Sequence, residues 1–357
     1  MCRSGQQVIE SGKMMTMKLW LFTIVLSLVT TVMHPVWAQH GEPTAGPFDP
    51  HAASIQALTL VGSDVVYAGS FGLGMFRSED RGTTWSKTGE GVTDPFILSL
   101  VTGKDGTVYA GTFRGGVFQS NDHGKSWRAI NSGLKRKEIK TLIAVGDVIY
   151  AGTADGAYKY NAATKRWSVV TTGLDDVLVH SLAQGADGTL YAGTSGKGVL
   201  RFKAKTAGWV RMRQGLKDHE GMIENFIRVL TIDPEGGIYA GTFDGGVFRS
   251  ADDGQTWRAI SRALPNDSIR GIVFNSRGLF VATGHGIFKT TDKGRQWVPL
   301  NHGLTSMSVQ VLIEAVNGSL YAGTNAGAFR SDDDGKSWTA INKGLEGGVA
   351  PPPFLFR

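Results

Sequence analysis

Cysteine is almost absent from the sequence, since Cys2 is the only one among 357 residues. A single cysteine at the extreme N-terminus excludes an internal disulfide, a cysteine-based metal site and a thiol nucleophile in the body of the chain. Charged residues are also few, at 19%, and the formal net charge is +6. The basic residues are spread along the chain instead of forming blocks, so charge gives no indication of nucleic acid as a partner.

Patterns typical of helices and of metal centres are missing as well. No unit of the sequence shows a clean amphipathic helical stretch of ten or more residues. The histidines are scattered, without H-x-H or H-E-x-x-H spacing, and we expect neither a metal nor a cofactor. Glycine is abundant, with 49 residues, and short β-branched and aromatic runs separate the glycines. This composition predicts a β-rich protein with many tight turns.

The one long apolar run lies near the N-terminus. It covers residues 19–33, follows Lys18 and leads to Val36-Trp37-Ala38. These features predict a signal peptide over residues 1–38 that is cleaved after Ala38, with translation starting at Met17 or at one of the two methionines just before it. An uncleaved membrane anchor is the alternative, although the run is shorter than the roughly 20 residues that a span requires. We therefore expect a periplasmic or secreted protein.

One segment recurs seven times after this leader. Residues 109–127 read YAGTFRGGVFQSNDHGKSW and residues 239–257 read YAGTFDGGVFRSADDGQTW; five further copies end at a tryptophan of their own. The seven tryptophans are spaced by 42, 40, 42, 48, 40 and 41 residues. A period of this length with four short strands per unit is typical of propeller blades. The sequence predicts an all-β, seven-bladed β-propeller of four-stranded blades over residues 54–345, a flexible leader over 39–53 and a proline-rich tail over 346–357.

Each unit offers four strands, A to D, of which strand B carries the YAGT segment and strand D starts at the tryptophan. Six units have a tyrosine in strand B, and we place Val281 at that position in the sixth unit. No strand is left over at either end of the array. We therefore expect the ring to close by packing between the first and the last blade.

The string S-x-D-x-G-x-[ST]-W occurs intact in four units, and residues 290–297 (TTDKGRQW) are a near copy. It resembles the Asp-box, or BNR, repeat of sialidase-like propellers. Asp and Ser side chains can bond nearby backbone amides and Gly supplies a positive φ, so we interpret the motif as a structural turn and not as a calcium or catalytic site. The tryptophan should be buried between blades, where truncation costs about 3–5 kcal/mol. The residues concerned are Asp80, Asp122, Asp252, Asp292, Asp333, Trp85, Trp127, Trp257, Trp297 and Trp338.

Function is expected where the units differ, because a residue type repeated around a ring cannot form one active site. The B–C and D–A loops should emerge on one face of the propeller. The candidate ligand- or partner-binding residues there are Phe71, Phe113, Arg114, Asp155, Lys197, Glu220, Glu224, Phe243, Asp244 and His285. The longest loop, residues 216–226, is either a contact or a neutral length variant.

The chain as a whole resembles the WD40/YVTN/BNR-like propellers, and among them the photosystem II stability/assembly factor group. This resemblance implies a non-catalytic scaffold that binds another protein during assembly. The predicted signal peptide places that partner in the cell envelope, and the mild, scattered charge predicts no nucleic acid partner. The alternative is a sialidase-like glycoside hydrolase acting on carbohydrate through paired loop carboxylates, which would stand about 5–5.5 or 6.5–9.5 Å apart. Spacing selects no such pair, sialidases have six blades where we count seven, and the Arg-Ile-Pro-type motif of sialidases is absent.

Overall fold

The computed structural model describes residues 53–170, 174, 176–203, 208–212, 214–216, 226–265 and 268–345. These residues belong to one compact unit, Pro43–Arg357. The predicted signal peptide, nearly all of the predicted leader and the predicted tail lie outside the described residues. So do Glu220 and Glu224, in the long loop before the fifth repeat.

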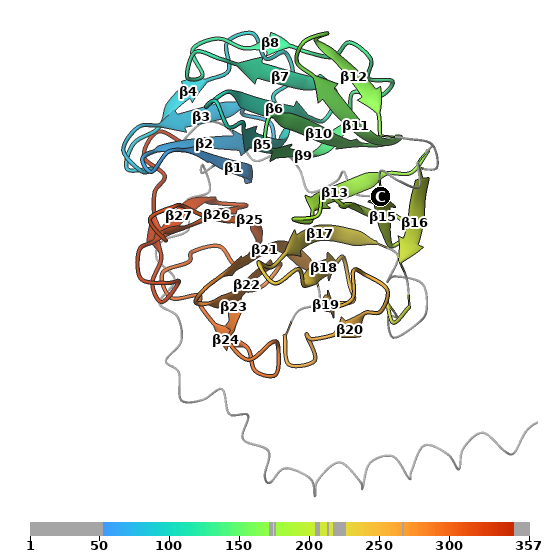
Figure 1. Ribbon diagram of the computed structural model, residues 1–357. Coiled ribbons are helices and arrows are strands. Elements are labelled where there is room, and N and C mark those ends of the chain that lie inside the picture. The colour runs from blue at the N-terminus through green and yellow to red at the C-terminus, as the bar shows by residue number, and fades with distance from the viewer. Residues whose placement is uncertain are drawn as a thin grey trace, which may run out of the picture. The chain divides into compact units, whose positions relative to one another are not determined.

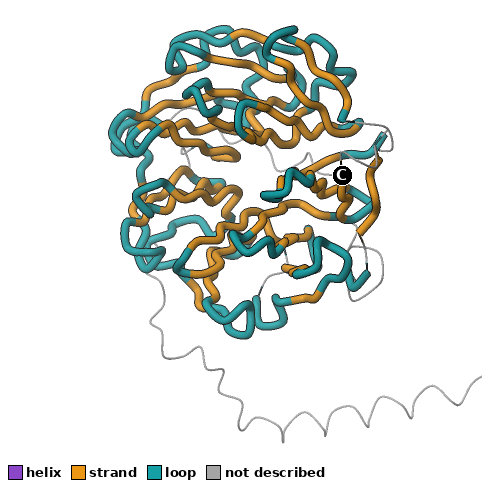
Figure 2. Tube along the Cα trace, in the orientation of Figure 1, coloured by secondary structure: helices purple, strands orange, loops and turns teal. Residues whose placement is uncertain are grey.

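Seven four-stranded sheets radiate from a central axis (Figure 1). Each sheet consists of four consecutive antiparallel strands, and the innermost strands of neighbouring sheets pack against one another around the full circle. The described residues contain strands, turns and loops and no helix (Figure 2), and hence no helix that could span a membrane. The prediction of an all-β, seven-bladed propeller is therefore confirmed.

The innermost strand of each blade, strand A, lies next to the central channel. The A strands are β1 (Ile55–Val61), β5 (Ile97–Thr102), β9 (Ile139–Val145), β13 (Val179–Gln184), β17 (Ile227–Ile232), β21 (Ile269–Asn275) and β25 (Val309–Glu314). The B strands follow as β2 (Val65–Ser70), β6 (Val108–Thr112), β10 (Val148–Thr153), β14 (Leu190–Thr194), β18 (Ile238–Thr242), β22 (Gly278–Thr283) and β26 (Leu320–Thr324). Most B strands are buried along their whole length, because a neighbouring blade covers each face.

The outer half of each blade is smaller. The C strands are β3 (Met75–Ser78), β7 (Val117–Ser120), β11 (Gly156–Asn161), β15 (Val199–Lys203), β19 (Val247–Ser250), β23 (Gly286–Thr290) and β27 (Gly327–Ser331). The D strands are β4 (Ser86–Thr88), β8 (Arg128–Ala129), β12 (Arg166–Val169), β16 (Gly208–Met212), β20 (Arg258–Ala259), β24 (Val298–Pro299) and β28 (Thr339–Ala340). The expected start of strand D at the tryptophan is wrong by one residue. In the five blades with the Asp-box turn the strand starts just after it, and in the other two it starts just before.

Glycine in the YAGT segment allows neighbouring blades to approach. A Cβ added to Gly241 would lie 2.5 Å from Cγ2 of Ile269 at the start of the next blade. The sixth blade has no glycine at this position. Its residue Phe280, and not Val281 as expected from sequence, takes the tyrosine position, because Phe280 pairs with Lys289 as Tyr239 pairs with Arg249. The glycine position is then Ala282, and the residue opposite on strand A is Gly271. The other six blades have Ala, Ser, Thr or Val at that strand A position.

The tryptophan of each Asp-box turn joins its blade to the preceding one. Trp338 donates its backbone N–H to His302 O at 2.9 Å and its indole N–H to Leu300 O at 2.8 Å, and its side chain is buried. The indole N–H of Trp85 bonds to Ile341 O of the seventh blade at 2.6 Å, so the ring closes through a contact that is also made at four other junctions, by Trp167, Trp209, Trp297 and Trp338. Closure by packing, without a shared strand, is what the four-strand units predicted.

Candidate functional site

The B–C turns and the D–A loops lie together at one end of the blades. In the second blade the backbone N–H of Phe113, at the B–C turn, bonds to Phe96 O, just before strand A, at 3.0 Å. Phe243 bonds to Phe226 O at 3.2 Å in the fifth blade, and three further blades repeat the contact. We call this end of the propeller the loop face. It contains the candidate residues that the sequence placed on B–C turns.

Every strand A has a β-bulge at its second residue, next to the loop face. In all seven blades the first residue of strand A pairs with the last residue of strand B. The next pair leaves out the second residue of strand A. A bulge re-aims the side chain of the extra residue. The seven bulged residues are Gln56, Leu98, Lys140, His180, Arg228, Arg270 and Gln310, all of them partly buried. We call this set the bulge ring.

One aromatic run on the loop face crosses the first and second blades. The rings of Phe71 and Phe96 meet edge to face with centroids 4.8 Å apart, and Phe96 meets Phe113 at 6.5 Å. The guanidinium of Arg114 lies 5.6 Å from the centroid of Phe96 and 5.7 Å from that of Phe113. Lys140 of the third blade reaches within 5.6 Å of the Phe113 centroid. Cations over ring faces hold both groups in place, so these residues form one ordered patch.

A second aromatic run crosses the fourth and fifth blades. The ring of His180 lies 4.6 Å from that of Phe226, which lies 5.4 Å from that of Phe243. Phe243 is 50% exposed, one of the five large apolar residues that are exposed in the described part of the chain. The Nε2 atom of His180 is hydrogen-bonded to Ser195 Oγ at 2.8 Å. The run therefore joins the bulge ring to an exposed phenyl ring.

Two acidic residues of the loop face are used in hydrogen bonds within the loops, Asp94 between a D–A loop and a B–C turn and Asp155 within its own turn. Asp94 is buried and accepts bonds from the backbone N–H groups of Phe96, Arg114 and Gly115. Asp155 accepts from Thr153 Oγ1 at 2.8 Å and from the hydroxyl of Tyr158 at 2.9 Å. Carboxylates engaged in this way hold the loop backbone in shape.

The remaining candidates on described B–C turns are spread over three blades. Lys197, Asp244 and His285 are exposed, and they belong to the fourth, fifth and sixth blades respectively. Among the described residues, no group of three or more His, Cys, Asp or Glu side chains could hold a metal ion. The loop face thus brings together Phe71, Phe113 and Arg114 in one run and places Phe243 in the other.

The Asp-box carboxylates are directed into their own turns. In the fifth blade Asp252 Oδ1 accepts from Ser250 Oγ at 2.7 Å and from the N–H of Thr256 at 2.8 Å, while Oδ2 accepts from Thr256 Oγ1 at 2.5 Å. Asp253 and Gly254 both have positive φ, of 59° and 82°. Asp80, Asp122 and Asp333 repeat this set of bonds, and Asp292 accepts two backbone N–H groups instead. Hydrogen bonds from Thr84 lower the pKa of Asp80 to about 2. Anionic carboxylates bonded in this way support a structural role for the motif.

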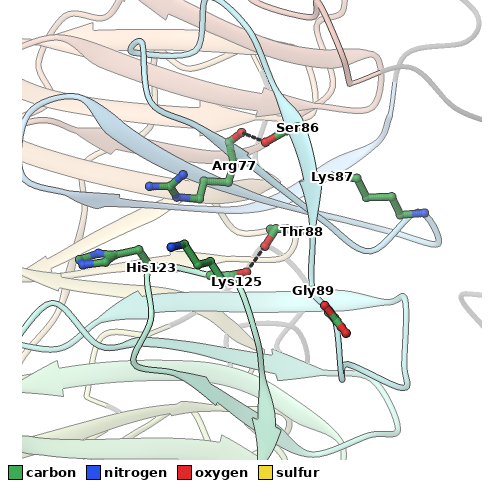
Figure 3. A pocket seen from close by; sticks show the side chains of 9 residues that line it. Arg77, Ser86, Lys87, Thr88, Gly89, His123 and Lys125 are labelled. Carbon is green, nitrogen blue, oxygen red and sulfur yellow. Dashed lines mark hydrogen bonds between the residues drawn. The ribbon is translucent and has the colours of Figure 1, made fainter.

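A cavity of about 500 Å³ lies away from the loop face, between the outermost strand of the first blade and the Asp-box turn of the second (Figure 3). Its charged lining residues are Arg77, Lys87, Glu90, His123 and Lys125. Arg77 is already paired with Glu79 at 2.7 Å and donates to the Tyr67 hydroxyl at 3.1 Å. The side chain of Lys87 points away from Arg77, His123 and Lys125 in Figure 3. Because acids accompany its cations, this cavity is a weaker candidate than the loop face.

Sequence reasoning missed the charged members of the bulge ring. Lys140, His180, Arg228 and Arg270 follow the buried first residue of strands β9, β13, β17 and β21. The available signal was their common phase, the second position of every strand A. From the sequence alone that position looks like any other strand position, because the sequence shows neither the bulge nor the neighbouring turns.

By sequence, the chain matches no family profile and no curated protein. Solved structures share its fold. The extracellular domain of what is described as a hybrid two component system from B. thetaiotaomicron is 19% identical with a TM-score of 0.68; the match covers 79% of this chain and 39% of that one. YCF48 bound to D1 peptide is 14% identical with a TM-score of 0.63, over 80% and 93% of the two chains. The GH74 enzyme of Niastella koreensis is 14% identical with a TM-score of 0.61, over 83% and 55%. At these identities the likeness establishes the propeller fold.

Proposed function

We propose that this protein is an exported, non-catalytic propeller that binds another protein of the cell envelope through its loop face. The observation that carries the proposal is the pair of aromatic runs, Phe71–Phe96–Phe113 and Phe226–Phe243, on that face. Both runs are flanked by cationic or imidazole side chains. Rigid aromatic residues beside Arg are typical anchors of protein interfaces, because they bury a large area at little cost in conformational entropy.

Two further observations support this function. The predicted signal peptide over residues 1–38, cleaved after Ala38, would deliver the propeller to the periplasm or the outside. One structure of the same fold is of YCF48 bound to D1 peptide. The fold therefore accommodates peptide recognition elsewhere, and the loop face is where we place it in this chain.

The test compares partner capture by four forms of the immobilised protein in envelope extract. The double variant Phe113→Ala/Phe243→Ala should lose a protein that the wild type retains. The matched control, Val298→Ala, removes a side chain that is 57% exposed on the outermost strand β24, and it should retain that protein. Phe113 is half-buried, so Phe243→Ala alone serves as the variant least able to disturb folding. Equal capture by all forms, with unchanged melting temperatures, would refute the proposal.

A glycoside hydrolase is the competing function, since GH74 enzymes share the fold. The hydrogen bonds of Asp94 and Asp155 to groups of the loop face argue against using these two acids as a catalytic pair. A panel of chromogenic glycosides provides the decisive measurement. Turnover by the wild type that falls in Asp155→Asn or Asp244→Asn would establish an enzyme in place of the binding protein.

A further inference from the structure

The bulge ring is strongly asymmetric in charge. The third to sixth blades place Lys140, His180, Arg228 and Arg270 at the bulge, whereas the other three blades place Gln or Leu there. Strands β9, β13, β17 and β21 are successive neighbours around the channel. Four basic side chains are therefore gathered along one arc of the channel mouth, next to the second aromatic run.

Two members of this arc have neighbours that satisfy them. The ammonium of Lys140 is 2.6 Å from a carboxylate oxygen of Glu138, and it also lies over the ring of Phe113. His180 shares a hydrogen bond with Ser195 Oγ. Burial, and then the charges of Lys140 and Arg228, lower the pKa of His180 to about 3, so the imidazole is neutral near pH 7.

The two arginines have no acidic partner among the described residues. Arg228 makes no hydrogen bond or ion pair there, and Arg270 donates only to Ser308 Oγ, at 2.7 Å. The Nε atom of Arg270 is buried and has no acceptor. Burial, and then Arg270, lower the pKa of Arg228 to about 10, and burial lowers the pKa of Arg270 as well. Guanidinium groups at partly buried sites are normally paired, because removing a charge from water without a counter-charge is costly.

An anion bound at Arg228 and Arg270 would supply the missing counter-charge. A guanidinium presents its N–H donors in a planar fork that matches the two oxygens of a carboxylate, and such charge-assisted bonds are the stronger kind. Arg228 is close enough to His180 to lower its pKa, and the ring of His180 lies 4.6 Å from that of Phe226. The half-buried ring of Phe226 in turn contacts the exposed ring of Phe243. The site thus combines two guanidinium groups with two neighbouring phenyl rings.

We propose that Arg228 and Arg270 bind a carboxylate of a polypeptide ligand at the mouth of the central channel, while Phe226 and Phe243 contact an apolar side chain next to it. This inference rests on the proposed function and specifies the chemistry of the partner. The carboxylate has two sources, an Asp or Glu side chain or a C-terminus. A nucleic acid fits less well, because its phosphates need a track of cations along the strand, whereas these two arginines form a single spot.

The test is calorimetric titration with three unlabelled peptides. They are hexaglutamate with both ends blocked, hexaalanine with a free C-terminus, and hexaalanine with both ends blocked. We expect binding of the first, the second or both, which identifies the source of the carboxylate, and no binding of the third. Arg228→Gln/Arg270→Gln should weaken binding at least tenfold. The control Lys87→Gln/Lys293→Gln removes the same charge from exposed sites away from the arc, and it should bind as the wild type does.

Several results would overturn the carboxylate site. These are equal weakening in both double variants, no binding of either carboxylate peptide by the wild type, or competition by inorganic phosphate at lower concentration than by acetate. Thermal melting gives a check that needs no ligand, because Arg228→Gln removes a charge without a described partner. It should leave the melting temperature unchanged or raise it, and a fall of several degrees would show that the arginine is already paired. Two results together would distinguish this inference from the proposed function. The carboxylate site would stand without that function if Arg228→Gln/Arg270→Gln lost peptide binding while Phe113→Ala/Phe243→Ala still captured the envelope protein.

Discussion

Gly303 offers a sharp test of how the blades are joined. It lies before the seventh blade with a φ of +88°, and an added Cβ would stand 2.1 Å from the carbonyl oxygen of Trp338. Four other glycines hold the same place against the tryptophan of another blade, at 2.1 or 2.2 Å. Gly303→Ala should therefore separate the seventh blade from the sixth at the point where the Trp338 N–H bonds to His302.

The expected loss of stability has three parts. A left-handed backbone costs a residue with a Cβ about 1–2 kcal/mol. Relief of the clash requires a shift of about an ångström, which in packed interiors costs about 1–3 kcal/mol. The shift would also break or weaken the two hydrogen bonds of Trp338, each with a net value of about 1 kcal/mol. We expect Gly303→Ala to lower the free energy of unfolding by about 4–7 kcal/mol in total.

Gly236 provides the matched control, since its φ is +85° and nothing lies within 4 Å of an added Cβ. Gly236→Ala has the backbone cost alone, about 1–2 kcal/mol. Urea unfolding followed by tryptophan fluorescence measures both variants against the wild type, provided that the transition is reversible. A loss in Gly303→Ala that is within about 1 kcal/mol of the loss in Gly236→Ala would refute the packing argument.

Three further predictions concern other parts of the ring. Gly271→Ala should destabilise the protein, because the new Cβ meets Ala282 Cβ at 3.3 Å, and adding Ala282→Gly should recover at least about 0.5 kcal/mol in a double-mutant cycle; strict additivity would contradict this. The pKa of His180 is lower folded than unfolded, so the stability due to its neutral form is full above pH 6.5 and is lost as the pH falls toward 3. This loss is about 2 kcal/mol between pH 6.5 and 5, and His180→Gln should lack it in melting curves at the two pH values. Asp333→Ala removes the exposed acceptor of Ser337 N–H and should cost about 0.5–1.5 kcal/mol in the same unfolding assay, whereas an unchanged value would remove the structural role of the motif.

The architecture could be predicted from the sequence because its signals repeat. Seven tryptophans at nearly constant spacing, each followed by a strand, leave little freedom in blade number. Phase within a unit was harder to determine. In the sixth unit the sequence Leu-Phe-Val-Ala-Thr has no tyrosine, and only the pairing of Phe280 with Lys289 shows which residue replaces it.

The candidate site was predicted less well, because it is built by neighbours from different blades. Phe96 stands in a D–A loop, and its contacts with Phe71 and Phe113 exist only once two blades are packed together. The role of Asp155 depends on a hydroxyl three residues away, a local bond that spacing does not reveal. The bulge that unites Arg228 and Arg270 at the channel mouth is a feature of backbone pairing, and no residue type marks it.

The two ends of the described ring meet in one place. Ala53 and Leu345 belong to the same buried cluster between the first and seventh blades, and no sheet borrows a strand across that junction. The blades follow one another around the ring in sequence order, and the ring therefore has no unique starting blade. A circular permutant, with a short linker between residues 345 and 53 and new termini in any other blade-to-blade connection, would keep all seven sheets whole. Because these connections are D–A loops, a fusion partner or a probe attached at the new termini would stand on the loop face, at a chosen position around the ring.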